Sequence, residues 1–392
     1  MKKYWKLLVV SLVIIFAISG HYIYSAKALQ SERVTFTIDP ITGDESELDD
    51  LIVEVSSYDA YTSQWVYISK DGVRDVRNRY ASNALFTSYE PLQFERYLTE
   101  YRSFMRGKQY DLNRYNEDGE RLIYVKTSDL GRAIYKGEPI KFKVDVLQKE
   151  TKKHTEFEAT ALAKSHYSWV NVVDVYAANG EVKVLVSGSF EDGGADLQLY
   201  TINEETQQVT ASETLSEKVR KDRIFANVYY YGDTQSLANT AHYVFRESTW
   251  RYDEKKHEDE ELTNDYFVYS VATKEIDALE LPVKENIYTA FQQGDSFYLT
   301  VEGKDSLIVH RYYFEDKEWA EPLTIGLPLD VERMPYLQAN GDKLYIANPE
   351  MRKNVLSIYD FSTAELLYKG EIIGENVGPY AEVLVGQIFM EN

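Results

Sequence analysis

The residues that could carry out catalysis do not fall at the spacings that known reactions need. The chain has no cysteine, which removes thiolate nucleophiles, disulfides, Cys-ligated metals and a lipid anchor on Cys. His257-Glu258 begins like a zinc-protease helix, but Glu261 stands where the second histidine belongs. Ser187-Gly188-Ser189 only approaches a serine elbow, and Gly303-Lys304-Asp305-Ser306 has an acid where a phosphate loop needs Ser or Thr. The sequence therefore predicts no catalytic residue and no cofactor, and it favours a protein without enzymatic activity.

Histidines and carboxylates are the remaining possible metal ligands. Outside the N-terminal segment and His257, the histidines lack ligand spacing and are expected on strand faces or turns: His154, His166, His242 and His310. Two acidic groups could attract calcium: Asp39, Asp44, Glu45, Glu47, Asp49 and Asp50, and the turn Glu191-Asp192-Gly193-Gly194-Ala195-Asp196. Neither has the calcium-loop pattern with Glu at its twelfth position, so ordinary turn chemistry is the favoured interpretation and no metal site is predicted.

The net charge of the protein limits the classes of partner that it can bind. The formal net charge is -21, and an acidic protein cannot displace the counterions of a phosphate backbone, which argues against nucleic acid. Glycoside cleavage needs two carboxylates across a groove, and 64 acidic residues would supply such a pair in any fold. The 33 tyrosines could form platforms for sugar rings, but the apolar faces of strands are the favoured interpretation.

The N-terminus indicates export. Lys2, Lys3 and Lys6 precede an apolar run from Leu7 to Ile18, as in a Sec-type signal. Cleavage after Ala28 would release the protein. Alternatively, Leu7–Ser25 provides about 20 residues for a single membrane crossing, which is the favoured alternative. The prediction is a single-pass cell-membrane protein whose ectodomain lies outside, with residues 1–28 as signal anchor or signal peptide.

Beyond this segment the chain predicts short strands. Residues 34–38 alternate apolar and polar side chains, residues 51–55 resume the pattern, and residues 65–69 end at the hairpin turn Asp71-Gly72. The exception is residues 91–106. Phe94, Leu98, Tyr101 and Met105 form a stripe that predicts one amphipathic helix with its apolar face in the core.

A loose repeat runs from residue 120 onward. An Asn/Gly/Asp turn introduces an apolar strand, and a second strand follows, as in residues 179–202, 294–309 and 340–359. The first-strand centres Tyr124, Val184, Val244, Tyr298 and Leu344 are separated by 60, 60, 54 and 46 residues. Propeller blades take about 40 to 50 residues, so residues 29–392 are predicted to form an all-β, propeller-like domain of six or seven irregular blades. A pair of large β-sandwiches is the alternative. Residues 252–265 are predicted to be a solvated, charged loop within one hairpin.

The exported part carries 39 basic against 64 acidic residues. Together with the Lys-rich anchor, the segment Arg102-Ser-Phe-Met-Arg-Gly107-Lys108 and the blade-like hairpins, it resembles uncharacterised, signal-anchored, propeller-like proteins of Bacillus-type Gram-positive bacteria. That resemblance implies no substrate or cofactor. The leading hypothesis is an ectodomain that binds an envelope or membrane protein. The alternative is a carbohydrate-active envelope protein that binds or cleaves glycans.

Overall fold

The computed structural model describes residues 5–31, 35–58, 63–78, 92–127, 133–221, 224–233, 236–253, 258–284, 287–327, 335–350, 353–375 and 382–390. Strands account for 64% of the structure and helices for about 11%. The chain forms two compact units: unit 1 contains Met1–Tyr89 and Pro328–Asn392, and unit 2 contains Glu90–Leu327. The predicted all-β class is confirmed.

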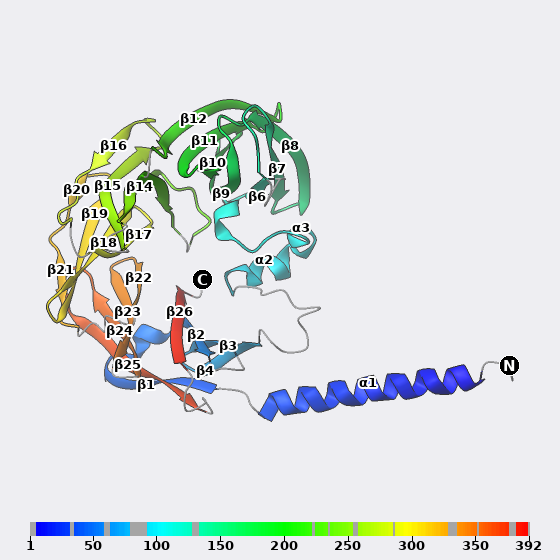
Figure 1. Ribbon diagram of the computed structural model, residues 1–392. Helices are drawn as coiled ribbons and strands as arrows, with labels where there is room; N and C mark the ends of the chain where they lie inside the picture. Colours follow the sequence, from blue (N-terminus) through cyan, green and yellow to red (C-terminus); the bar gives the residue numbers. More distant parts are fainter. Residues whose placement is uncertain are drawn as a thin grey trace. The chain divides into compact units, whose positions relative to one another are not determined.

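Unit 2 contains four antiparallel sheets that follow one another in chain order (Figure 1). The first has β5 (Tyr115–Glu117), β6 (Arg121–Thr127), β7 (Pro139–Gln148) and β8 (Lys153–Leu162). The second has β9 (Tyr167–Ala178), β10 (Glu181–Phe190), β11 (Gly194–Asn203) and β12 (Gln208–Val219). The third has β13 (Ile224–Tyr231), β14 (His242–Asp253), β15 (Glu258–Ser270) and β16 (Ile276–Leu279). The fourth has β17 (Ile287–Gln293), β18 (Ser296–Gly303), β19 (Ser306–Tyr313), β20 (Glu318–Trp319) and β21 (Leu323–Ile325).

Unit 1 contains two sheets that join strands from distant parts of the chain. One has the order β1-β25-β24-β23-β22, and the other has the order β26-β2-β3-β4. The strands are β1 (Thr35–Gly43), β2 (Leu51–Tyr58), β3 (Ser63–Ser69), β4 (Gly72–Asn78), β22 (Tyr336–Asn340), β23 (Lys343–Glu350), β24 (Lys353–Asp360), β25 (Leu366–Glu375) and β26 (Glu382–Met390). The 3₁₀ turn η1 (Glu45–Leu48) follows β1.

Four or five antiparallel strands in one sheet, mostly in consecutive order, form the blade of a propeller. The described residues contain six such sheets, which agrees with the predicted six or seven blades. Strand β10 is buried or half-buried at every position, because Val182, Val184 and Val186 pack with the first sheet while Leu185 packs with the third. The preceding turn has φ of 53° at Asn179 and 75° at Gly180, values suited to a two-residue hairpin.

The core of unit 2 lies between neighbouring sheets. Phe142 and Val144 of the first sheet pack with Val172 and Val184 of the second. Leu197 and Leu199 on the other face of the second sheet pack with Tyr243 and Phe245 of the third. Val244 and Val268 of the third sheet pack with Phe297 of the fourth sheet and with Phe314, which follows strand β19. Each middle sheet is therefore buried on parts of both its faces.

The predicted helical insertion is present, but it is broken. Pro91 lies outside the described residues, and the segment forms η2 (Leu92–Phe94), α2 (Glu95–Glu100) and α3 (Arg102–Met105). The helix is interrupted at Tyr101, where φ is -124° and ψ is 38°. The change of direction buries Phe104 beside Met105, which a straight helix with the predicted stripe would not do. The expectation that the apolar face lies in the core is confirmed by the burial of Phe94 and Met105.

The predicted charged loop is mostly strand. Residues 252–253 end β14 and residues 258–265 begin β15, and these segments pair with each other. The prediction of one hairpin is confirmed, whereas the loop assignment is wrong, because the backbone pairing of β14 with β15 continues out to Asp253 and Glu258 although the side chains there are charged.

An N-terminal helix, α1 (Trp5–Ser31), is also present. Every described side chain of this helix, Trp5 and those of residues 9–21, is exposed. In the part of the chain that the structure describes, no helix is both long enough and apolar enough to cross a membrane.

Candidate functional site

The third sheet of unit 2 carries aromatic and polar side chains together on one face. Strand pairing places Phe225 of β13 beside Trp250 of β14, and Tyr229 beside Arg246. Trp250 in turn pairs with Glu261 of β15. Because successive side chains of a strand point to opposite faces, these residues share a face. We call this set the aromatic face; its members are Phe225, Tyr229, Arg246, Trp250, Glu261 and Asn264.

The aromatic face continues a face that is buried further along the same strands. Tyr231, Tyr266 and Val268 pack against Phe297 and Phe314 of the fourth sheet. At the aromatic face, by contrast, Tyr229 keeps 40% of its surface exposed and Glu261 is exposed, while Phe225 and Trp250 are half-buried. The third sheet thus presents rings to solvent where its buried face ends.

The rings are arranged as platforms. Phe225 and Trp250 are stacked with their centroids 6.1 Å apart and their planes at 17°. The Arg246 guanidinium lies 4.5 Å from the centre of the Tyr229 ring, and the Arg220 guanidinium lies 4.3 Å from the centre of the Phe225 ring. Cation–π contacts of this kind hold ring planes in place.

Two buried polar atoms of the aromatic face lack hydrogen-bond partners. They are Nε of Arg246, which is a donor, and Oδ1 of Asn264, which is an acceptor. The Asn264 amide nitrogen lies 3.4 Å from Oε2 of Glu261. Both atoms are covered by the protein itself, so a ligand on the outer side of the sheet cannot reach them in this conformation.

A second cluster joins Lys108, Asp145 and His154 at the edge of the first sheet. Lys108 Nζ lies 2.6 Å from Oδ2 of Asp145, and His154 Nδ1 lies 2.9 Å from Oδ1 of the same carboxylate. Lys108 also donates to the Phe104 carbonyl and lies 3.8 Å from the Phe104 ring centre. A His–Asp pair can orient a general base, but here Lys108 neutralises the carboxylate, and the cluster anchors α3 to β7 and β8.

Two aspartates of the second sheet have raised pKa values. Burial raises the pKa of Asp174 to about 6, although Tyr230 donates a hydrogen bond of 2.6 Å to its carboxylate. Burial likewise raises the pKa of Asp196 to about 6, although Tyr167 and Gln198 donate to it. Half-buried Asp174 of β9 accepts from Tyr230 of the third sheet, and buried Asp196 of β11 accepts from Tyr167 of β9, so both carboxylates are bonded to groups of the fold.

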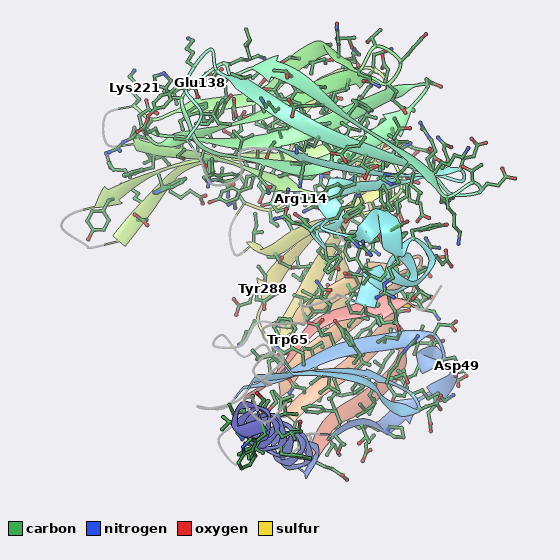
Figure 2. The ribbon with its side chains drawn as sticks, turned by 90° about the vertical axis from the view of Figure 1, so that its right-hand side faces the viewer. Asp49, Trp65, Arg114, Glu138, Lys221 and Tyr288 are labelled. Atoms are coloured by element: carbon green, nitrogen blue, oxygen red, sulfur yellow. The ribbon has the colours of Figure 1, made fainter. Side chains whose placement is uncertain are left out.

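A buried arginine lies on η3 (Leu112–Arg114) (Figure 2). The Arg114 Nε donates to Asp111 at 2.9 Å, and its Nη2 donates to Asn171 of β9 at 2.6 Å. Its Nη1 is buried without a partner. The arrangement ties the helical insertion to the second sheet.

The two acidic groups considered for calcium are used in turns and ion pairs. Asp44 accepts from the Ser46 amide and caps η1, Asp49 pairs with Lys70, and Glu47 pairs with Lys343. Asp196, from the second group, is buried between strands. Within the described ranges, no group of three or more His, Asp or Glu side chains is close enough to hold a metal ion.

The remaining histidines and the two short motifs named above lie in ring contacts, in a strand or in a turn. His242 stacks on Phe314 with ring centres 4.7 Å apart, His310 meets the Trp319 ring, and His166 meets the Tyr135 ring. Ser187 to Ser189 lie within β10, and residues 303–306 form the turn between β18 and β19. His257 lies outside the described residues.

Sequence reasoning missed the aromatic face. Its signal was the alternation of Phe225, Asn227, Tyr229 and Tyr231, a period of two that marks one face of a strand. That alternation alone does not reveal that Trp250 and Arg246 join the same face, since they are brought there by strand pairing.

Comparison with known proteins assigns this chain to no family. No family model matches the chain, and no curated protein is matched. Among solved structures, the β-propeller domain of the Trilobed protease from Pyrococcus furiosus is similar over 85% of this chain and 98% of that chain, with 11% identity and a TM-score of 0.31. The Dos1 propeller is similar over 85% of this chain and 74% of that chain, with 10% identity and a TM-score of 0.32. Apo AztD from Citrobacter koseri is similar over 86% and 99%, with 9% identity and a TM-score of 0.36. The strand order within the sheets defines the fold of this protein.

Proposed function

We propose that the protein is an ectodomain tethered to a membrane by α1, which acts at the cell envelope by binding a partner and does not turn over a substrate. The tether is supported by large apolar side chains that surround α1 and contact no core: Val9, Val10, Leu12, Val13, Ile14, Ile15, Phe16 and Ile18, with exposed fractions from 44% to 71%. A helix that is apolar all round is stable when hydrocarbon surrounds it.

The described residues of α1 do not by themselves make a membrane-crossing helix, so the proposed crossing depends on the whole apolar run Leu7–Ser25 of the sequence. The backbone of α1 runs for 27 residues. At about 1.5 Å per residue it measures about 40 Å, against about 30 Å for the hydrocarbon core of a bilayer. The lysines at positions 2, 3 and 6 would remain on the cytoplasmic side, and the two sheet-built units would lie outside.

The binding role rests on the aromatic face, the single observation that carries it. The stacked Phe225 and Trp250 rings are half-buried and the Tyr229 ring is exposed, so this part of the sheet keeps aromatic surface in contact with solvent. Trp250, Tyr229 and Arg246 are of the residue types that dominate binding hot spots in protein interfaces, so the face supports an envelope or membrane protein as the partner.

Membrane retention tests the tether directly. Cells expressing the full chain should yield it in the membrane fraction after washing with carbonate, with the intact N-terminal segment found by mass spectrometry. Recovery of the protein from the medium with its N-terminus at Leu29 would show that the N-terminal segment is a cleaved signal and would contradict the tether. Turnover is tested separately by incubating the purified protein with peptidoglycan and a glycoside panel, where release of product would contradict the binding role.

A further inference from the structure

We propose that residues 258–265 of strand β15 bind a lysine- or arginine-rich segment of a partner protein, which joins the third sheet as an added strand. We call these residues the open edge of β15. The inference rests on the proposed binding role and names the chemistry of the partner segment.

The outer strand of the third sheet is incomplete. On its inner side, β15 pairs with β14 along nearly its whole length. On its outer side, β16 pairs only with residues 266–269, and within the described ranges no strand pairs with the outer side of residues 258–265. In the first sheet, by contrast, β8 pairs along the whole of β7. The open edge therefore presents a row of unpaired backbone amides and carbonyls, which is a template for an extended segment.

Strand β16 ends where the fourth sheet holds the chain that follows it. The Glu280 carbonyl accepts a hydrogen bond of 2.9 Å from the Trp319 indole nitrogen. Leu281 packs in the core between the third and fourth sheets. Pro282 comes next and has no amide hydrogen to donate to a strand ladder. The fold itself thus leaves the outer position beside the open edge to a strand from another chain.

The charges of the open edge select a basic segment. Asp259, Glu260, Glu261 and Asp265 are exposed, and the sequence of the open edge contains no basic residue. Pairing with β14 places Asp259 and Glu261 on one face of the sheet, and Glu260 and Asp265 on the other. Basic side chains of an added strand therefore meet acids on either face, and opposite charges on neighbouring strands attract.

A second copy of this chain does not suit the open edge. Pairing of two open edges would set acids beside acids, and like charges on neighbouring strands are destabilising. Arg251 of β14 shows the favoured pairing, because its guanidinium lies 2.6 Å from the Glu260 carboxylate.

The outer strands of the first and second sheets are edges of mixed charge. Lys153 and Glu156 both lie on β8, and Glu217 and Lys218 both lie on β12. A strongly basic strand would meet like charges there. It is therefore expected at the open edge of β15 in preference to β8 or β12.

Fluorescence anisotropy of labelled peptides tests the proposal, with the full chain in a non-ionic detergent at about 0.15 M salt, where distant charges are screened. The probe is a peptide of about nine residues that alternates lysine with valine. One comparison peptide has glutamate for each lysine. The other has proline for each valine, which keeps the charge but prevents a strand ladder. We expect the lysine–valine peptide to bind, and the two comparison peptides to bind about tenfold more weakly or not at all.

Hydrogen exchange locates the added strand. Binding of the lysine–valine peptide should slow exchange of backbone amides within residues 259–264, because a new ladder occupies those that point outward. Exchange within residues 155–160 of β8 should not change.

Variants with matched charge locate the site independently. Asp259→Lys/Glu261→Lys should weaken peptide binding by about tenfold or more, since two attractive pairs become repulsive. Asp259→Asn/Asp265→Asn should weaken it by about threefold, which keeps the test valid if the first variant fails to fold. Glu156→Lys/Glu158→Lys is the control, because it changes the net charge of the protein equally but lies on β8. Its Kd should equal that of the unchanged protein.

The proposal is overturned if the lysine–valine peptide does not bind, or if the proline or glutamate peptide binds as tightly. It is also overturned if both variants of the open edge fold and bind the peptide like the β8 control. Membrane retention and release of product, which test the proposed function, are measured without any peptide. Failure of the open edge and failure of the proposed function are therefore distinguishable.

Discussion

The Tyr167 hydroxyl donates a hydrogen bond of 2.6 Å to the Asp196 carboxylate, joining β9 to β11 across the intervening strand β10. The contact passes over Gly188, the β10 residue paired with Asp196. Asp196 is 1% exposed, and its Oδ1 has no partner. A carboxylate in this position makes the stability of unit 2 depend on pH.

Asp196→Asn should stabilise the protein above pH 6 and have little effect near pH 4. Burial raises the Asp196 pKa from 3.8 to about 6, so the unfolded chain loses this proton first as pH rises, and stability falls through that window. The shift corresponds to about 3 kcal/mol, which the variant regains while it keeps an acceptor for Tyr167. Urea unfolding of both proteins at pH 4 and pH 7 measures the effect. A stability difference that is the same at both pH values would contradict it.

Gly188→Ala should destabilise the protein by about 1 to 3 kcal/mol, the cost of overpacking a well-packed core. A Cβ at this position would lie 2.4 Å from Cε1 of Tyr167 and 2.6 Å from Oδ1 of Asp196. Gly119→Ala is the control, because a Cβ there meets no atom within 4 Å. Thermal unfolding followed by circular dichroism compares them, and equal midpoints for the two variants would show that the cradle around Gly188 is looser than described.

Lys108→Met should destabilise the protein by about 3 kcal/mol, because it leaves the Asp145 carboxylate buried without its main counter-charge. The side chains of Lys108 and Asp145 are 9% and 8% exposed. The double variant Lys108→Met/Asp145→Leu should recover much of the loss. Lys317→Met, in the exposed pair with Asp277, should leave the urea midpoint unchanged. If Lys108→Met behaves like Lys317→Met, the buried pair contributes no stability.

Asn239→Ala should detach the loop before β14 from the second sheet. The Asn239 side chain accepts from the Ala177 amide at 2.9 Å, donates to the Ala177 carbonyl at 2.8 Å and accepts from Asn116 at 2.9 Å. Loss of these bonds leaves buried groups unpaired, and we expect a cost of about 2 kcal/mol or more. Hydrogen exchange at the Ala177 amide should accelerate, whereas Ser236→Ala in the same loop should leave it protected.

Local patterns predicted the strands well. The segments from Val182 to Val186 and from Leu197 to Ile202 are rich in apolar side chains and are bounded by turn residues. Both segments are strands in the structure. Such signals are local, since the residues that define the strand also define its turn. The break at Tyr101 could not be predicted in this way, because the reason for it is the space that the first sheet provides for Phe104.

Pairings between distant segments left no signal in the sequence. β26 pairs with β2, and β1 pairs with β25, at separations of hundreds of residues. The aromatic face is unpredictable for the same reason: Phe225 and Trp250 meet only because β13 and β14 pair in one register. A slip by one residue would turn every ring to the opposite face.

The pairing of β2 with β26 constrains the order of folding during synthesis. Strand β2 leaves the ribosome early, but its partner β26 spans residues 382–390 and emerges more than three hundred residues later. At about 5 to 20 residues per second, β2 waits for some tens of seconds with one edge unpaired. The sheets of unit 2 have consecutive strands and can form during that interval. A chain whose translation stops short of β26 therefore exposes an open strand edge, which is a template for pairing with another chain.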